Sequence, residues 1–187
     1  MLARHDVPDL KFTWFRHHCR TFPLHPLTPR QLAWRLAQDL PANATFWFGA
    51  GLPQLLHEFS MSTATGNGRP LDLAVITADE VGAAGDFNSS TMMPAAIRRI
   101  WIMAPLFRDD GRPLLVEHCS TATRHGVTAT RLYTDIAVFD FVQGRVQLRG
   151  LIEGITLQTL QVELDVELQV SPELTLLQIP LALGGNY

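Results

Sequence analysis

The sequence predicts an α/β domain built on a parallel or mixed sheet with helices on its faces. Residues 132–141 are largely apolar on both alternating faces, which is typical of a strand covered on two sides. A capped helix begins near residue 28, and a strand that ends in a Gly-x-Gly turn before another helix follows it. The 187 residues, of which 47% are hydrophobic and 18% charged, are enough for one sizeable core.

Residues 1–27 are expected to form an N-terminal arm. The arm contains three prolines and the aromatic and basic run K-F-T-W-F-R-H-H-C-R-T-F. Its aromatic side chains are expected to pack on the domain or on a partner, with the arginines outside. His17, His18 and Cys19 suggest a metal site at first sight, but adjacent ligands rarely converge on one ion. No metal site is therefore expected.

The domain itself is expected to span residues 28–182. Thr28-Pro29-Arg30-Gln31 is a capping box with proline at the first helical position, and it predicts a helix over Pro29–Leu40. The segment T-F-W-F then predicts a short buried strand, followed by G-A-G-L-P and a helical Q-L-L-H-E-F. Such a turn brings backbone N–H groups and a positive helix end toward an anion or an acyl oxygen. Tight packing of strand on helix explains the two glycines nearly as well.

The C-terminal part predicts a strand over Leu132–Phe141, a Gln-Gly turn and a second strand over Val146–Leu151. Together these form a hairpin expected at the sheet edge. Thr156 is expected to cap a short helix. The segment Val162–Val170 alternates Val and Leu with acidic residues and Gln, which predicts a half-solvated strand whose acids face water. Residues 183–187 are expected to be a flexible tail.

Composition excludes several classes of protein. A net charge of -3 and a pI near 6.1 argue against nucleic acid as a partner, since phosphate binding needs a basic field. No apolar run approaches the roughly 20 residues that span a bilayer, so no membrane partner is expected. The N-terminus lacks the apolar centre of a signal peptide, which predicts a cytoplasmic protein. Cys19 and Cys119 are too few for a disulfide framework and are expected to be reduced.

Five ordered blocks in the last part of the chain resemble the C-terminal part of the β subunit of class I (3-oxoacid) CoA-transferases. They are R-R-I-W-I-M, G-R-P-L-L-V-E-H-C-S, R-L-Y-T-D-I-A-V-F-D-F, E-G-I-T-L and E-L-Q-V-S-P-E-L. Such a series is more specific than any single motif. The segment from Pro29 to Phe59 is similar to the start of the same subunit, with Gly49, Gly51 and Pro53 on its glycine loop. The loop G-D-F-N-S-S-T resembles the glutaconate-type branch.

This resemblance implies an open, mixed and mostly parallel sheet, a coenzyme A thioester as substrate with no other bound cofactor, and a partner. The partner is an α-like subunit or a second copy of the chain. The family's nucleophile is a glutamate in a Ser-Glu-Asn-Gly motif, which attacks the acyl-CoA to give a glutamyl-CoA thioester. The nearest segment is Thr65-Gly66-Asn67-Gly68, where Gly66 stands in the place of the glutamate. The family's later glycine-rich loop is missing as well.

The residues expected near an acyl-CoA are therefore Gly49, Gly51, Asn67 and Gly68, and none of them is a chemical catalyst by its side chain. Four other carboxylates are candidates to replace the glutamate, namely Glu58, Asp79, Glu80 and Glu117. Glu58 is more simply part of a solvated helix face. Asp79 and Glu80 end an expected strand, where ligands bind in open α/β sheets but polar turns are also common. Glu117, His118 and Cys119 are expected on a strand, where neighbours point to opposite faces, so no Cys-His dyad is expected.

Three functions from different classes remain open. The first is a CoA-transferase-type β subunit that acts on acyl-CoA with an α-like subunit. The second is a hydrolase or C–C bond-cleaving acyl-CoA enzyme of the same superfamily, with the catalytic carboxylate on the partner. The third is a noncatalytic scaffold, a pseudoenzyme retained for assembly. The loss of the glutamate favours the second and third functions, whereas the resemblance favours acyl-CoA chemistry.

Overall fold

The computed structural model describes residues 26–60, 70–94, 96–121, 127–179 and 181–183. Most of the expected arm, the Thr-Gly-Asn-Gly segment and the end of the tail lie outside these residues. The described part is organised around a seven-stranded sheet with a smaller three-stranded sheet beside it. No helix in the described ranges is long and apolar enough to cross a bilayer.

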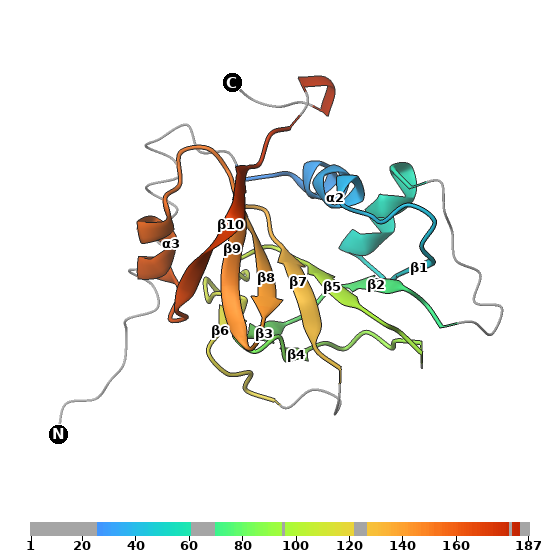
Figure 1. Cartoon of the computed structure of the whole chain (residues 1–187), viewed down its shortest axis with the longest axis horizontal. Coiled ribbons are helices and arrows are strands. Elements are labelled where there is room, and N and C mark those ends of the chain that lie inside the picture. Colours follow the sequence, from blue (N-terminus) through green and yellow to red (C-terminus); the bar gives the residue numbers. More distant parts are fainter. Residues whose placement is uncertain (1–25, 61–69, 95, 122–126, 180, 184–187) are drawn as a thin grey trace.

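The large sheet is mixed and mostly parallel, which confirms the predicted fold class (Figure 1). Its strands, in spatial order, are β1 (Phe46–Phe48), β2 (Leu73–Ile76), β5 (Ile100–Met103), β7 (Ala129–Tyr133), β8 (Ala137–Val142), β9 (Arg145–Leu151) and β10 (Leu168–Leu176). The first four run parallel to one another, β8 is antiparallel to both β7 and β9, and β10 is parallel to β9. Every residue of β2 and β5 is buried, as expected for strands covered on both faces.

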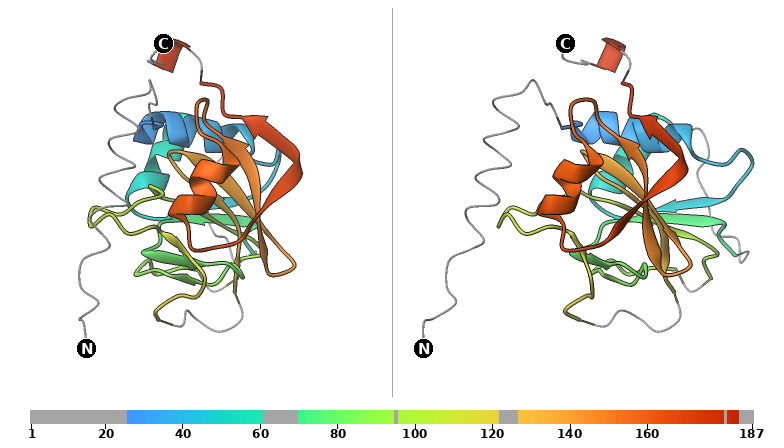
Figure 2. Two further views of the ribbon diagram at one scale, coloured as in Figure 1. Left: turned by 90° about the vertical axis from the view of Figure 1, so that its left-hand side faces the viewer. Right: turned by 60° about the vertical axis from the view of Figure 1, so that its left-hand side comes forward.

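The small sheet consists of β3 (Glu80–Gly82), β4 (Phe87–Asn88) and β6 (Leu115–Val116), in the order β4-β3-β6. Figure 2 shows it on one side of the large sheet, opposite α2. The chain therefore leaves the large sheet after Ile76 and enters the small one at Glu80. The Asp79 N–H donates to the carbonyl of Asn88 at 2.8 Å, which aligns the start of β3 with β4. The carboxyl end of β2 consequently lies between the two sheets.

Helix α2 (Pro29–Gln38) begins with the predicted capping box. The Thr28 hydroxyl accepts from the Gln31 N–H at 3.3 Å, and the Gln31 side chain accepts from the Thr28 N–H at 2.8 Å. The helix ends two residues before the predicted Leu40, and it buries Leu32, Ala33 and Leu36. The other helices are η1 (Leu52–Glu58), α3 (Leu157–Glu163) and η2 (Leu181–Leu183), where η marks the tighter 3-10 form. Thr156 caps α3 as expected.

The single strand predicted over Leu132–Phe141 is wrong, because the segment contains two strands and a tight reversal. The buried Thr134 hydroxyl accepts from the N–H groups of Ile136 and Ala137, and it donates to the carbonyl of Ala137. These bonds replace the ladder bonds that a continuous strand would make. The next turn matches its prediction: Gln143 and Gly144 both have positive φ, 52° and 73°, as a two-residue hairpin requires. The hairpin is not the sheet edge, because β10 covers β9.

The strand predicted over Val162–Val170 is also wrong in its first half. Val162 and Glu163 complete helix α3, and β10 begins only at Leu168. Glu163 is buried rather than facing water. Alternation of apolar and polar residues over a few positions fits the last turn of a helix as well as a strand, and the Thr156 cap sets the helix here.

Candidate functional site

The glycine loop lies where β1 ends, at the carboxyl edge of the parallel strands. The Gly49 N–H donates to the carbonyl of Val75 at 2.8 Å, which ties the loop to β2. Gly51 has φ 82° and ψ −135°, a backbone conformation that essentially only glycine adopts. The turn therefore needs glycine at this position, and it points the chain directly into η1.

Three successive N–H groups of this loop have no acceptor among the described residues. In the described part of the chain, the backbone N–H groups of Ala50, Gly51 and Leu52 donate to no acceptor. Ala50 and Gly51 are exposed, so water or a bound group can reach these donors. Backbone N–H groups without a protein acceptor can stabilise an anion or a carbonyl oxygen that develops negative charge.

The loop that follows β4 packs against the glycine loop. The Ser89 hydroxyl donates to the carbonyl of Thr77 at 2.7 Å and accepts from the Thr91 N–H at 3.1 Å. A Cβ placed on Gly49 would lie 3.2 Å from Cγ2 of Thr91, so the two loops touch. The structure thus brings together two segments that the sequence singled out separately, G-A-G-L-P and G-D-F-N-S-S-T.

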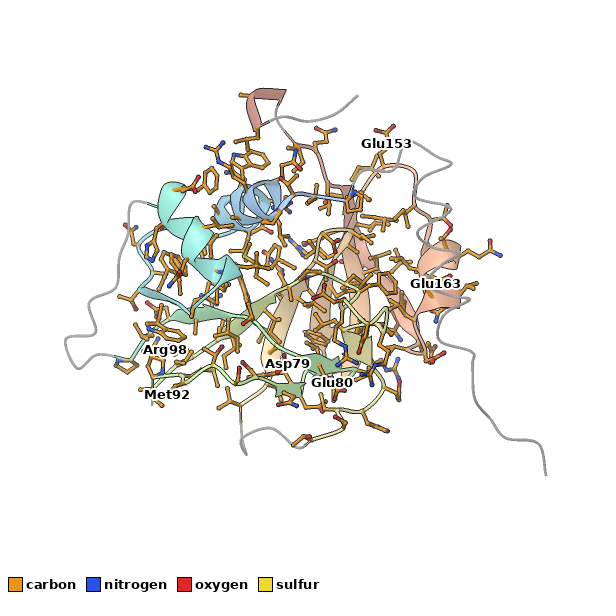
Figure 3. All side chains as sticks on the ribbon, turned by 180° about the vertical axis from the view of Figure 1, so that it is seen from behind. Asp79, Glu80, Met92, Arg98, Glu153 and Glu163 are labelled. Carbon is orange, nitrogen blue, oxygen red and sulfur yellow. The ribbon has the colours of Figure 1, made fainter. Side chains whose placement is uncertain are left out.

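Two of the candidate carboxylates stand at the same end of β2 but in different environments (Figure 3). Glu80 accepts from the hydroxyl of Ser120 at 2.6 Å and from its N–H at 2.7 Å, and Arg108 lies 3.7 Å away. The hydrogen bonds from Ser120, and then the charge of Arg108, hold the pKa of Glu80 below its usual range. Asp79, in contrast, has an exposed side chain. The carboxylate of Glu80 is therefore already bound by Ser120 and Arg108, whereas the carboxylate of Asp79 is accessible to solvent.

Sequence reasoning missed the two residues that hold Glu80. Ser120 is 40 positions away from it, and Arg108 reaches across from the connection after β5. Arg108 also donates to the carbonyl of Asp79 at 3.3 Å. Its Nε is buried without a hydrogen-bond acceptor among the described residues. No local pattern marks these residues, because the contacts depend on how β3 and β6 pair in the small sheet.

The remaining candidate nucleophiles lie outside the glycine loop and the Asp79-Glu80 turn or are unreactive near neutral pH. Glu58 is exposed at the end of η1 and forms an ion pair with Arg30 at 2.9 Å, as a solvated helix face predicts. The sequence predicts Glu117, His118 and Cys119 on a strand, but β6 ends at Val116, and Glu117 and His118 are exposed in a bend. Burial, and then the hydrogen bond to the carbonyl of Asp86, raise the pKa of Cys119 to about 12. A thiol with that pKa is not a nucleophile near neutral pH.

The other half of the predicted site lies outside the described residues. This holds for Gly66, Asn67 and Gly68, and also for His17, His18 and Cys19 of the arm. Within the described residues, no group of three or more His, Cys, Asp and Glu side chains is arranged to hold a metal ion. The site that can be described is therefore the glycine loop, the Ser-Ser-Thr loop and the Asp79-Glu80 turn.

A second polar cluster, which the sequence did not predict, lies between α2 and the large sheet. Arg131 forms a two-pronged ion pair with Asp140 and stacks on Trp101, 5.3 Å from its ring centre. The Tyr133 hydroxyl donates to Asp39 at 2.8 Å, just beyond the end of α2. Burial lowers the pKa of Arg131, but its hydrogen bond to Asp140 and the neighbouring Tyr133 outweigh this and raise it. The cluster fixes the end of α2 above β7, so its role is positional.

The fold of this chain is similar to that of CoA-transferase β subunits. The sheet is mostly parallel, the glycine loop follows its first strand, and the Ser-Ser-Thr loop packs against the glycine loop. No protein-family profile matches the chain. The resemblance therefore rests on individual relatives and on shared architecture.

A curated relative is one subunit of the probable succinyl-CoA:3-ketoacid coenzyme A transferase of Bacillus subtilis (strain 168). It is 28% identical over 118 residues, which cover 56% of this chain and 54% of the relative. The chain thus spans about half the length of the curated relative it matches. This similarity confirms the resemblance to CoA-transferase β subunits that the sequence blocks indicated.

Solved structures share the fold at low sequence identity. The acyl-CoA transferase YdiF of Escherichia coli O157:H7 has a TM-score of 0.62 at 19% identity, over 87% of this chain and 46% of that one. Glutaconate coenzyme A-transferase of Acidaminococcus fermentans has a TM-score of 0.61 at 12% identity, over 82% and 90% of the two chains. The decarboxylase AibA/AibB has a TM-score of 0.57 at 16% identity, over 82% and 90% as well. One fold therefore serves enzymes with different named reactions.

Proposed function

We propose that this chain is a cytoplasmic acyl-CoA-binding subunit that works with an α-like CoA-transferase subunit. Its glycine loop receives the thioester carbonyl oxygen of the acyl-CoA, and the partner supplies the reactive carboxylate. Two observations carry the proposal. The N–H groups of Ala50, Gly51 and Leu52 have no acceptor among the described residues, and the carboxylate of Glu80 is already held by Ser120. Named relatives that act on acyl-CoA support the substrate class.

The chemistry assigned to the glycine loop is electrostatic. Attack on a thioester places negative charge on its oxygen, and donors that are already in position stabilise that charge without rearranging. Removing one such donor in other enzymes costs about 100- to 1,000-fold in rate. The loop has no side chain that could form a covalent intermediate, so the nucleophile has to come from elsewhere in the assembly.

A C–C bond-cleaving or decarboxylating enzyme is the second candidate. It is favoured by the Thr-Gly-Asn-Gly segment, which has no glutamate, and by the shared fold of a solved decarboxylase. In this version the same N–H groups stabilise the enolate oxygen that forms when a carbon–carbon bond beside a thioester breaks. The two candidates use one loop and differ in the bond that breaks.

The test is intact-mass spectrometry of the chain after incubation with acetoacetyl-CoA and succinyl-CoA, alone and with an α-like subunit, followed by borohydride or hydroxylamine trapping. We expect no covalent CoA adduct on this chain, with turnover or an adduct only when the partner is present. An adduct on this chain contradicts the proposal. Asp79→Asn, with Glu58→Gln as the matched control, then shows whether the accessible carboxylate carries it.

Absence of turnover in every combination, together with a stable complex, supports the scaffold function instead. Turnover without exchange of CoA between acids supports the decarboxylase or hydrolase alternative. The Gly51→Ala variant separates binding from assembly: we expect it to form the complex while its turnover falls at least about tenfold.

A further inference from the structure

Exposed apolar side chains on the described surface are concentrated near the C-terminus. The outer strand β10 exposes Val170 (49%), Leu174 (41%) and Leu176 (61%), and we call these three residues the β10 patch. Figure 1 shows β10 at the end of the large sheet, where no further described strand covers it. An apolar edge of this kind usually has an occupant.

The form of β10 disfavours the addition of another strand. Pro172 has no N–H to donate, and the pairing with β9 shifts register between Val170 and Thr175. A second copy of this chain, pairing edge to edge, would meet both interruptions twice. Side-chain packing by a segment rich in aromatic residues suits this edge better than a backbone ladder.

The first described residues of the chain lie close to this edge. The Leu27 N–H donates to the carbonyl of Asp135 at 2.7 Å, and the next carbonyl, that of Ile136, accepts from the Ile152 N–H at 3.0 Å. Leu151, adjacent to Ile152, is paired in register with Leu176. The described chain therefore begins at the end of the sheet where Leu176 of the β10 patch lies. At roughly 3.3 Å per residue, 25 residues can easily reach along one strand.

The distribution of charge also favours an interaction between residues 1–25 and the C-terminal part of the domain. Residues 151–187 contain five acidic residues and no Lys or Arg. Of these, Glu153 and Glu167 are exposed, whereas Glu163 is buried and Glu173 forms an ion pair with Arg149 of β9. Residues 1–25 contain four basic residues, Arg4, Lys11, Arg16 and Arg20, against two acidic ones. They also contain the aromatic residues Phe12, Trp14, Phe15 and Phe22. Glu153 precedes α3 in the sequence, Glu167 follows it, and both are exposed. Figure 3 shows Glu153 on the side of the domain where β10 lies.

We infer that residues 1–25 dock on the β10 patch, with their aromatic side chains on Val170, Leu174 and Leu176 and their basic residues toward the acidic C-terminal segment. The described large sheet has two outer strands, the short β1 and the long β10. The docked segment covers the edge of β10 and keeps it from pairing with other chains.

The experiment is hydrogen–deuterium exchange on the full chain. In the wild type, we expect amides within residues 10–25 to exchange at least about tenfold more slowly than in an unstructured peptide of the same sequence. Leu174→Ser should remove this protection, whereas Val142→Ser, at a side chain of equal 41% exposure on the β8–β9 hairpin, should keep it. Unprotected amides in the wild type, or equal protection in both variants, overturn the proposal.

Charge reversal gives the second arm of the test. The double variant Glu153→Lys and Glu167→Lys should lower the protection of residues 10–25, while Asp109→Lys with Glu117→Lys, which makes the same charge change at exposed sites elsewhere, should not. Light scattering of the same samples separates the occupants. A dimer mass that Leu174→Ser converts to a monomer assigns the β10 patch to a second copy and overturns docking of the arm.

Discussion

At the scale of single residues, the candidate site depends on backbone conformations more than on reactive side chains. The positive φ at Gly51 sets the direction of the loop's N–H groups, and the lack of a Cβ at Gly49 lets the Ser-Ser-Thr loop approach. Sequence reasoning identified both glycines, because a Gly-x-Gly turn between a strand and a helix is typical of a tight backbone approach. It could not identify Arg108 and Ser120, whose partner Glu80 is 28 and 40 positions away.

Replacement of Gly51 tests the backbone requirement. An alanine at φ 82° and ψ −135° is strained by about 1–3 kcal/mol, so Gly51→Ala should lower the free energy of unfolding by that amount. Ala50→Ser, at the exposed neighbouring position, should change it by less than about 0.5 kcal/mol. Urea denaturation followed by fluorescence measures both. Equal stabilities of the two variants would mean that the loop relaxes freely.

Asp135 provides a test by pH. Burial raises the pKa of its carboxyl above the usual range, although the Leu106 N–H that it accepts at 2.8 Å acts in the opposite direction. The folded state then holds this proton more tightly than the unfolded state does. Its contribution to stability is complete below the unfolded pKa and is lost as the pH rises through the folded pKa.

Asp135→Asn removes this titration and keeps an oxygen for the Leu106 N–H. The free energy of unfolding of the variant, relative to the wild type, should therefore increase between about pH 3 and pH 7. Asp109→Asn, at an exposed carboxyl, provides the baseline for the same pH series. A relative stability that falls with pH would show that the Leu106 hydrogen bond outweighs burial.

At the scale of elements, the structure agrees with the sequence wherever a local chemical signal fixes an end. The capping box begins α2, and Gln143-Gly144 makes the turn between β8 and β9. The two errors have a different origin. Residues 132–141 carry no glycine or proline at the reversal, because a buried threonine makes that turn instead. A threonine between apolar residues is an ordinary strand residue in most sequences.

Thr134→Val is the prediction at this scale. It keeps the shape of the side chain but leaves the Ala137 N–H, which donates to the hydroxyl at 2.9 Å, without this partner inside the protein. The expected loss is about 1–3 kcal/mol in the free energy of unfolding. Thr128→Val, at an exposed position before β7, is the matched control and should stay within about 0.5 kcal/mol of the wild type.

At the scale of the whole molecule, the predicted function requires a complex. The chain spans about half of the curated relative it matches and 46% of the chain of an acyl-CoA transferase of the same fold. With an α-like CoA-transferase subunit, light scattering should give the mass of a heteromer. A well-behaved monomer, both alone and with that subunit, would contradict the proposed partnership. The fold class was predictable from the sequence because apolar strands and ordered family blocks agreed on it.

The arrangement of the large sheet also has a consequence for the order in which the protein folds. Strands β7, β8 and β9 are joined by short turns, whereas β1, β2 and β5 pair with strands about 27 residues away in sequence. Closing those longer loops costs more chain entropy, so the local hairpins should form first. The ribosome, however, releases β1 and β2 before β7 exists. Strand β1 can pair with β2 at that stage, but β2 also needs β5 and Glu80 needs Ser120, so the candidate site is completed only after Ser120 has emerged.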